Sequence, residues 1–320
     1  FMPGLAGVPA ATSSISDVDG QRGILEYRGI RVETLCAESS YLETAYLLLF
    51  GHLPSAAEFQ QWTTDVTRHR RIKFRIIDLL KCLPEQGHPM DALQAAVAAL
   101  GMFYPGRQVK DVENNYWSAV RLVAKLPTIV AAWARLRHGD DPIQPRDDLG
   151  FSENFLYMLT ESVAPSVWAD IFDDCLILHA EHTMNASTFT GLVTASTLAD
   201  PYTVVASSIG ALKGPLHGGA NEEVVVMLRE IGTAEKARPY VERTLQNKKK
   251  LMGFGHRVYT VKDPRATVLQ ELCRRLFKEC GSSPLYEIAL EVETAAGTTL
   301  NSKGIYPNVD FYSGIIYDKM

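Results

Sequence analysis

Segments with the apolar spacing of helices fill most of this chain after residue 90, and this pattern constrains the fold more than any other feature. Only residues 23–32 look extended, like a pair of short strands that turn at Arg28 and Gly29. Pro127 predicts a kink or break inside its helix, and the unusually long segment 166–198 is expected to form two pieces. The pattern predicts a mostly α fold with helices over 91–103, 117–137, 149–160, 166–198, 202–212, 221–231, 234–251, 264–280 and 285–300.

Length and composition agree with an ordinary globular protein. The 320 residues suggest two domains, and a rise in charge and glycine after Lys213 places their boundary between 1–214 and 215–320. A net charge of -5 argues against a protein that coats nucleic acid. Five cysteines without a CxxC pair argue against a disulfide framework. We expect a cytoplasmic protein without a membrane span, and without a signal peptide at Phe1–Gly4.

Several motifs with known chemistry are missing or incomplete. The chain has no P-loop, no dinucleotide-binding GxGxxG and no GxSxG nucleophile elbow. His179 and His182 are three residues apart and would share a helix face, but no third ligand motif accompanies them, so no metal site is expected. The basic stretch 68–75 has interleaved apolar residues and predicts the solvated face of an amphipathic helix, with a subunit contact or anion site as the alternatives.

Two histidines lie in glycine-rich turns that precede predicted helices. His217 stands in GPLHGGAN, which begins at Gly214, and His256 stands in GFGHRVY, which begins at Gly253. Glycines let a backbone turn tightly and let a ligand approach. A helix N-terminus would keep the His217 imidazole neutral, so that it can donate to a carbonyl that becomes an enolate.

Two charged residues stand at predicted helix starts. Asp263 followed by Pro264 predicts an N-cap that fixes Arg265 in the first helical turn. Asp310 stands at a further predicted helix start. One such residue is usually a cap or a loop group. Two imidazoles, a carboxylate and an arginine together indicate acid–base chemistry on an anionic carbonyl substrate.

The chain closely resembles citrate synthase, in the short bacterial form. The matching segments stand in the family's order and span essentially the whole chain: DGQRGILEYRG from Asp19, LHAEHTMNAST from Leu178, GPLHGGANEEV from Gly214, MGFGHRVY from Met252, DPRA from Asp263 and YPNVDFYSG from Tyr306. The resemblance implies a large and a small helical domain with the active site in the cleft between them. It also implies a homodimer, with a higher oligomer as an open alternative, and no metal or redox cofactor.

The resemblance also implies a reaction and residue roles. Oxaloacetate would condense with acetyl-CoA, and citryl-CoA would then be hydrolysed. Asp310 would remove a methyl proton from acetyl-CoA, His217 would stabilise the enol or enolate, and His256 would bind the oxaloacetate carbonyl and supply a proton. Arg265 would pair with an oxaloacetate carboxylate, as a guanidinium fork can. His182 and, more weakly, Asn185 are further oxaloacetate ligands.

The coenzyme is expected against the backbone of Leu251, Met252, Gly253, Phe254 and Gly255. Thr260 stands where relatives often carry a lysine suited to the CoA phosphates, so Arg257, Lys262 or the lysines at 248–250 would have to take that part. The family also continues after the Asp310 segment with large-domain helices that carry two more substrate arginines. The non-methionine start favours a sequence that is part of a longer polypeptide. If the polypeptide ended at Met320, we would expect weak or no turnover.

Two alternatives remain open at this point. A 2-methylcitrate synthase, which uses propionyl-CoA, shares the catalytic motifs, although Leu216 before His217 fits the citrate enzyme slightly better. A non-catalytic assembly protein on the same fold is the second alternative, and His217, His256 and Asp310 count against it.

Overall fold

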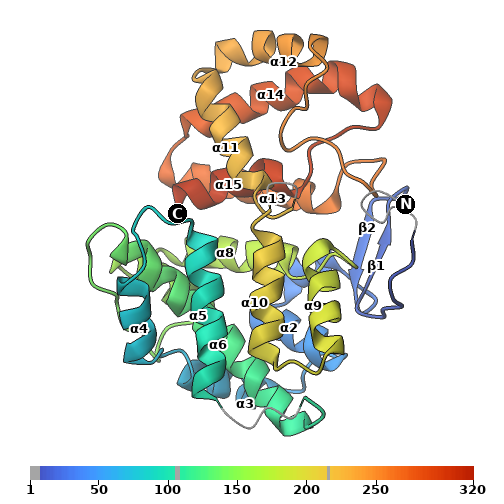
Figure 1. Ribbon diagram of the computed structural model, residues 1–320. Coiled ribbons are helices and arrows are strands. Elements are labelled where there is room, and N and C mark those ends of the chain that lie inside the picture. The colour runs from blue at the N-terminus through green and yellow to red at the C-terminus, as the bar shows by residue number, and fades with distance from the viewer. Residues whose placement is uncertain (1–7, 105–108, 215–216) are drawn as a thin grey trace. The chain divides into compact units, whose positions relative to one another are not determined.

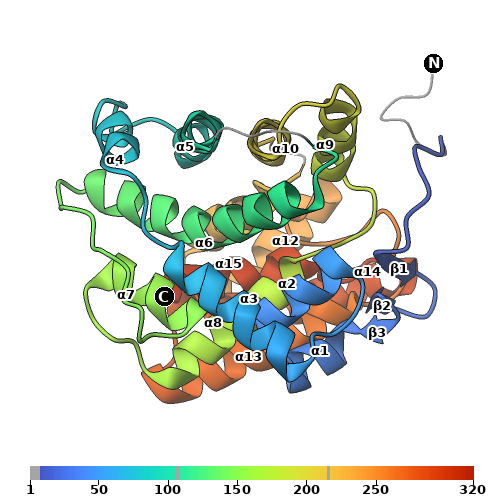
Figure 2. The same cartoon turned by 90° about the horizontal axis from the view of Figure 1, so that it is seen from below.

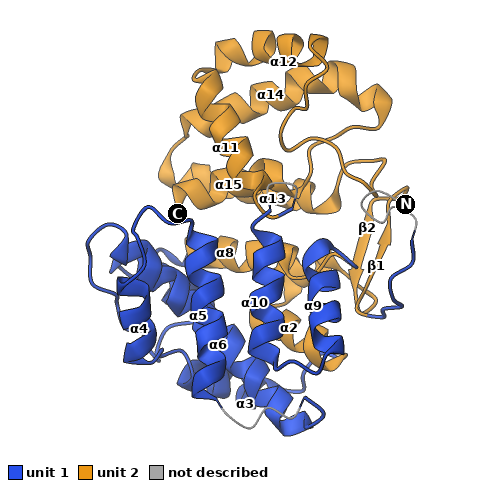
Figure 3. Cartoon of the chain, in the orientation of Figure 1, with its two compact units in different colours: residues 1–14, 52–166, 183–217 blue, residues 15–51, 167–182, 218–320 orange. Residues whose placement is uncertain are grey.

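Helices make up most of the described residues, as the sequence predicts (Figure 1). The computed structural model describes residues 8–104, 109–214 and 217–320. The chain divides into two compact units, each assembled from separate stretches of sequence (Figure 3). Unit 1 comprises residues 1–14, 52–166 and 183–217, and unit 2 comprises residues 15–51, 167–182 and 218–320.

Unit 1 is helical and packs around α5 and α6. Its helices are α3 (Ala56–Arg68), α4 (Phe74–Lys81), α5 (Pro89–Phe103), α6 (Val112–Leu136), α7 (Phe151–Thr160), α9 (Ala186–Ser196) and α10 (Pro201–Leu212). Figure 2 shows α5 and α10 nearly end-on along one side of α6, and α9 packs beside α10. Residues from α4, α5, α6 and α10 form its core, including Ile76, Val97, Ile129 and Ile209.

Unit 2 combines a small sheet with the remaining helices. Strands β1 (Ser16–Asp19), β2 (Ile24–Tyr27) and β3 (Ile30–Arg31) pair antiparallel, with Val18 opposite Leu25 and Tyr27 opposite Ile30. Leu25 and Tyr27 are buried, so the strand alternation turns one face inward. The helices are α1 (Val32–Glu38), α2 (Tyr41–Phe50), α8 (Ser166–His179), α11 (Ala220–Ile231), α12 (Ala237–Gln246), α13 (Pro264–Cys280), α14 (Pro284–Leu300) and α15 (Val309–Lys319), with 3-10 turns at Ala234–Lys236 and Asn301–Lys303.

The predicted elements differ from the structure at several points. The long segment 166–198 does form two helices, α8 and α9. Helix α6 continues through Pro127, so a break there is wrong. The predicted helix 234–251 ends at Gln246, five residues early, and the strand β1 was not expected.

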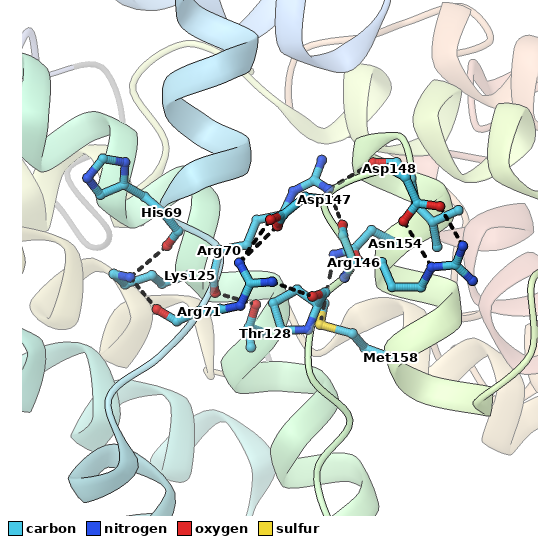
Figure 4. A network of polar contacts seen from close by, with 12 residues as sticks. His69, Arg70, Arg71, Lys125, Thr128, Arg146, Asp147, Asp148, Asn154 and Met158 are labelled. Carbon is cyan, nitrogen blue, oxygen red and sulfur yellow. Dashed lines mark hydrogen bonds and ion pairs between the residues drawn. The ribbon is translucent and has the colours of Figure 1, made fainter.

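The basic stretch 68–75 does not form the predicted helical face. Helix α3 ends at Arg68 and α4 begins at Phe74. The backbone between them bonds to α6 instead: Nζ of the buried Lys125 donates to the carbonyls of His69 and Arg71, at 2.6 Å each, and Thr128 donates to the carbonyl of Arg70 at 2.8 Å (Figure 4). Carbonyls held in this way are not available to an α-helical ladder. The stretch therefore breaks the helix.

Arg70 in this stretch is buried rather than solvated. Arg70 is 2% exposed, and its Nη1 donates to the carbonyls of Arg146 and Leu149 at 3.0 and 2.8 Å (Figure 4). Burial lowers its pKa. Arg71, which pairs with Asp147 at 2.9 Å, keeps about half of its side chain exposed.

The predicted domain boundary, after residue 214, lies three residues before the chain passes from unit 1 to unit 2 for the last time, after His217. Pro215 and Leu216 lie outside the described residues, and so do Phe1–Gly4 at the start. The assignment of domains to 1–214 and 215–320 stays a prediction. Among the described residues, no helix is long and apolar enough to cross a membrane.

Candidate active site

Asp263 and Arg265 form a buried ion pair at the start of α13, in unit 2. The Asp263 carboxylate accepts from the backbone N–H of Arg265 at 2.9 Å, which confirms the predicted N-cap. It also accepts from Nε and Nη2 of the same arginine at 3.1 and 2.8 Å. The two residues are 1% and 5% exposed. Against the effect of burial, this pairing keeps the pKa of Arg265 above its ordinary value, so the site holds a permanent cation.

The geometry around His256 fixes its tautomer. Its Nδ1 accepts from the backbone N–H groups of Val258 and Tyr259, at 3.0 and 3.2 Å. A nitrogen that accepts two hydrogen bonds carries no proton, so the neutral ring must carry its proton on Nε2. Burial lowers the pKa of His256, Arg265 lowers it as well, and Asp263 opposes them. The ring is therefore a neutral Nε2–H donor near pH 7.

His182 lies against His256 in the same unit. The two ring centroids are 5.0 Å apart, and Nε2 of His182 is 3.2 Å from the Tyr259 hydroxyl oxygen. Burial lowers the pKa of His182 to about 3, and the charge of Arg265 acts in the same direction. His182 is thus a second neutral imidazole in this cluster.

His179 and His182 do not share a helix face, contrary to the expectation from their spacing. Helix α8 ends at His179, and Thr183 has a φ of 60°, which a continuing helix excludes. Nδ1 of His179 is 2.7 Å from the carbonyl of Cys175, and burial lowers its pKa to about 4. In the described part of the chain, no group of three or more metal-ligating side chains could hold an ion.

Asp310 is the second residue of α15, whose N-cap is Asn308. Its backbone N–H donates to the side-chain oxygen of Asn308 at 3.0 Å, and its carboxylate has no hydrogen bond among the described residues. Burial raises the pKa of Asp310 to about 6, and Asp263 adds to this while Arg265 opposes it. A carboxylate with that pKa is ionised at pH 7 and is a stronger base than an ordinary aspartate.

The Asp310 turn is joined to the turn that carries His256. The backbone N–H of Asn308 donates to the carbonyl of Gly253 at 2.9 Å, and the N–H of Gly255 donates to the carbonyl of Tyr306 at 2.8 Å. The Asn308 side chain adds a bond to the carbonyl of Gly255 at 2.9 Å. Gly253 has a φ of 75°, and a Cβ there would lie 2.8 Å from the Phe311 ring, so glycine is required.

His217 and Asn185 belong to unit 1. Nε2 of His217 is 2.8 Å from the hydroxyl of Ser187, which in turn lies 3.1 Å from the carbonyl of Ser208. Nδ1 of His217 has no partner among the described residues, and burial lowers the pKa of the ring. Asn185 is the N-cap of α9, and its side chain accepts from the N–H of Thr188 at 3.0 Å. His217 lies two residues before Gly219, the N-cap residue of α11.

The residues predicted to bind the coenzyme differ in their surroundings. Leu251 is buried, and the carbonyls of Gly253 and Gly255 already accept bonds from Asn308. Arg257 is exposed and makes no described contact. Lys262 is held within unit 2 by Gln270 and Glu293, at 2.9 and 3.0 Å, which leaves it less free to reach a phosphate.

Four of the residues singled out from the sequence thus belong to unit 2: His182, His256, Arg265 and Asp310. His182 and His256 are in ring contact, and the charge of Arg265 acts on all three partners. Sequence reasoning missed Tyr259, Ser187 and Asn308 as contributors. Each stands inside a segment that carries the family resemblance, and that position is the signal that could have found them.

Comparisons with known proteins agree with one another. Residues 4–320 match the family model described as citrate synthase, C-terminal domain. A citrate synthase from Synechocystis is 59% identical over 320 residues, which cover 100% of this chain and 81% of that protein.

Solved structures give the same result for the fold. The citrate synthase of Pyrobaculum aerophilum matches with a TM-score of 0.92 and 40% identity, covering 100% of this chain and 82% of that one. The enzyme of Thermoplasma acidophilum, solved with carboxymethyl coenzyme A and oxaloacetate, matches with a TM-score of 0.92 and 33% identity, covering 99% of this chain and 84% of that one. The protein is therefore an enzyme of the transferase type, and the chain belongs to the citrate synthase family.

Proposed function

We propose that this enzyme condenses acetyl-CoA with oxaloacetate and hydrolyses the resulting citryl-CoA to citrate and CoA. The observation that carries the proposal is the cluster in unit 2. It combines a base with raised pKa, a buried arginine and two neutral imidazoles, one of which has its proton fixed on Nε2. These groups suit proton removal next to a carbonyl and the binding of an anionic keto acid.

Asp310 is the proposed base for the acetyl methyl group. Its ionised carboxylate takes one methyl proton, and the electron pair of the C–H bond moves into the enolate. A thioester α-proton is only weakly acidic, so a carboxylate needs help at the carbonyl oxygen. One positioned donor at such an oxygen contributes on the order of 3 kcal/mol.

His217 is the proposed donor to that oxygen. The Ser187 hydroxyl donates to the carbonyl of Ser208 at 3.1 Å and lies 2.8 Å from Nε2 of His217, so it can donate to Nε2 when it turns away from that carbonyl. When Ser187 donates to Nε2, the neutral ring carries its proton on Nδ1, which then donates to the enolate oxygen.

His256 is the proposed donor to the ketone oxygen of oxaloacetate. As the enolate carbon bonds to the ketone carbon, the carbonyl electrons move to that oxygen, which takes a proton from Nε2 of His256. His256 is left without a ring proton and Asp310 with one extra, so the cycle closes when Asp310 loses the proton it took and His256 regains one. Water then cleaves the thioester of citryl-CoA.

The substrate carboxylates are assigned to Arg265, with His182 and Asn185 as further ligands. The bonds to Asp263 use Nε and Nη2 of Arg265, which leaves Nη1 for an oxaloacetate carboxylate. For the coenzyme we keep the backbone of residues 251–255 against the adenine. For the phosphates we favour Arg257, which is exposed, over Lys262, which is paired with Glu293.

Four further points stay proposals: the domain assignment 1–214 and 215–320, a homodimeric state, a cytoplasmic location and the absence of a cofactor. Light scattering on the eluted protein tests the oligomeric state. A monomer would contradict the dimer.

The deciding experiment measures thiol release from acyl-CoA and oxaloacetate by the purified full-length protein. We expect CoA release from acetyl-CoA with citrate as the product, and a lower kcat/KM for propionyl-CoA. A clear preference for propionyl-CoA would establish a 2-methylcitrate synthase instead. Leu216, the residue that favoured the citrate enzyme, lies outside the described residues. No thiol release with either thioester would favour a non-catalytic protein.

A further inference from the structure

Tyr259 contacts both imidazoles of the unit 2 cluster. Its hydroxyl oxygen is 3.2 Å from Nε2 of His182, and its ring centroid is 5.6 Å from that of His182. The His256 ring centroid is 4.6 Å away, and the backbone N–H of Tyr259 donates to Nδ1 of His256. One residue therefore touches the ring of one histidine and sets the tautomer of the other.

The backbone next to Tyr259 bonds to the turn between β1 and β2 at Thr260 and approaches it closely at Val258. The N–H of Thr260 donates to the carbonyl of Gly20 at 2.9 Å, and the Thr260 hydroxyl donates to the same oxygen at 3.3 Å. A Cβ on Gly20 would lie 2.1 Å from the carbonyl oxygen of Val258. The sheet thus fixes the position of Tyr259 at close range.

The hydroxyl of Tyr259 has one described partner. The residue is 3% exposed, and His182 is the only hydrogen-bonding group that contacts its phenol among the described residues. Burial raises the pKa of the phenol, with Asp263 adding to the effect, so the group stays protonated and can donate to Nε2 of His182. A donated proton at Nε2 leaves the single proton of the neutral His182 ring on Nδ1.

We propose that Tyr259 is a positioning residue that orients His182 for oxaloacetate through its hydroxyl, while its backbone orients His256. The proposal rests on the proposed function, because it takes His182 as a ligand of the keto acid. It assigns to the hydroxyl an effect on oxaloacetate binding and none on the coenzyme. If the His182 ring were free to rotate, oxaloacetate would bind more weakly, because the orientation of the ring would have to be fixed on binding.

The kinetic test uses Tyr259→Phe, which keeps the ring and the backbone N–H and removes only the hydroxyl. We expect KM for oxaloacetate to rise about tenfold, as for the loss of one hydrogen bond. The values of kcat and of KM for acetyl-CoA should stay within about threefold. Unchanged KM for oxaloacetate would overturn the proposal, and so would an equal loss in all three parameters.

Tyr202→Phe is the matched control. Tyr202 is 2% exposed, and its hydroxyl has no partner among the described residues. This variant also removes a buried phenol oxygen, but from unit 1. All three parameters should stay at the wild-type value. If Tyr202→Phe raised KM for oxaloacetate as much as Tyr259→Phe, the effect would be nonspecific and the proposal would be wrong.

A double-mutant cycle separates action through His182 from general disturbance. In a His182→Ala background, Tyr259→Phe should have no further effect on the oxaloacetate Kd measured by calorimetry. An undiminished effect in that background would show that the hydroxyl does not act through His182.

A measurement on the resting protein distinguishes failure of this proposal from failure of the proposed function. With ¹⁵N-labelled histidine, the ring nitrogens of His182 report which one carries the proton. We expect these signals to move in Tyr259→Phe and to stay in place in Tyr202→Phe, whether or not the wild type turns over. Unmoved His182 signals in Tyr259→Phe would overturn the proposal even in an active enzyme.

Discussion

Asn308 bonds in two directions: its side-chain amide donates to the carbonyl of Gly255 at 2.9 Å, and its side-chain oxygen accepts from the N–H of Asp310 at 3.0 Å. One short side chain therefore caps the helix of the proposed base and holds the turn that precedes His256. Through these two hydrogen bonds, Asn308 links the helix that carries Asp310 to the turn that carries His256 within unit 2.

Replacing Asn308 should separate these two tasks. Asn308→Ala loses the cap and the bond to Gly255, and we expect about 1–2 kcal/mol less stability and about tenfold lower kcat. Asn308→Ser keeps a capping oxygen but is too short to reach Gly255, so it should retain most of the stability and still lose activity. Denaturant unfolding and thiol-release kinetics measure both. Full activity in Asn308→Ser would show that the bond to Gly255 is dispensable.

Asp310 predicts the acid limb of the pH profile. Since the carboxylate must be ionised to act as a base and its pKa is raised to about 6, kcat/KM for acetyl-CoA should be level above that pH and fall about tenfold per unit below it. Asp310→Asn should lower kcat by about a thousandfold. A profile that stayed level down to pH 4.5 would contradict this assignment.

The same carboxylate should reduce the stability of the fold at neutral pH. Its folded pKa lies above the ordinary 3.8, so its contribution is fully favourable below pH 3.8 and is lost as the pH rises through about 6. Asp310→Asn should therefore be more stable than the wild type at pH 7.5, by about 1–3 kcal/mol, and the gap should narrow toward pH 5. Urea unfolding at the two pH values measures it. Equal stability at pH 7.5 would be the contrary result.

Ser187 should matter through the tautomer of His217. Ser187→Ala removes the hydroxyl next to Nε2, so either nitrogen can carry the proton, and we expect kcat to fall about tenfold with little change in KM for oxaloacetate. Ser196→Ala is the control, because among the described residues that hydroxyl bonds only to the carbonyl of Val193, on an exposed turn of α9. Equal kinetics in the two variants would rule out a role for Ser187.

Gly20 should tolerate no side chain. A Cβ at this position would lie 2.1 Å from the backbone oxygen of Val258, so Gly20→Ala must displace the turn next to Tyr259, and we expect a loss of about 2 kcal/mol or more with weaker oxaloacetate binding. At Gly150 the nearest atom to an added Cβ is 3.9 Å away, so Gly150→Ala should cost less than about 1 kcal/mol. Thermal unfolding compares the pair, and similar losses would contradict the steric argument.

The sequence predicted most of the helices after residue 90, and it failed where a distant partner decides the local structure. The spacing of apolar residues places α5, α10, α11, α13 and α14 within a few residues of their observed bounds. Residues 69–73 have the composition of a helix, but Lys125 and Thr128 of another helix take their carbonyls. No local pattern contains that information.

The site shows the same division. The N-cap at Asp263 is local and was predicted, because a carboxylate before a proline is a signal within three residues. The contact of Tyr259 with His182 joins positions 77 residues apart, and the His217 contact with Ser187 joins positions 30 apart. Spacing along the chain does not report which side chains meet after folding, so these two contributors came from the structure.

The bond from Thr260 to Gly20 joins residues that are 240 positions apart in the chain. A ribosome adds about 5–20 residues per second, so the turn between β1 and β2 waits on the order of 10–50 s during synthesis before its partner exists. The strands themselves all lie within residues 16–31, so only the turn between β1 and β2 depends on this late bond. The part of the cluster around His256 and Tyr259 therefore gains this support only after the first two stretches of unit 2 and the start of the third have been synthesised.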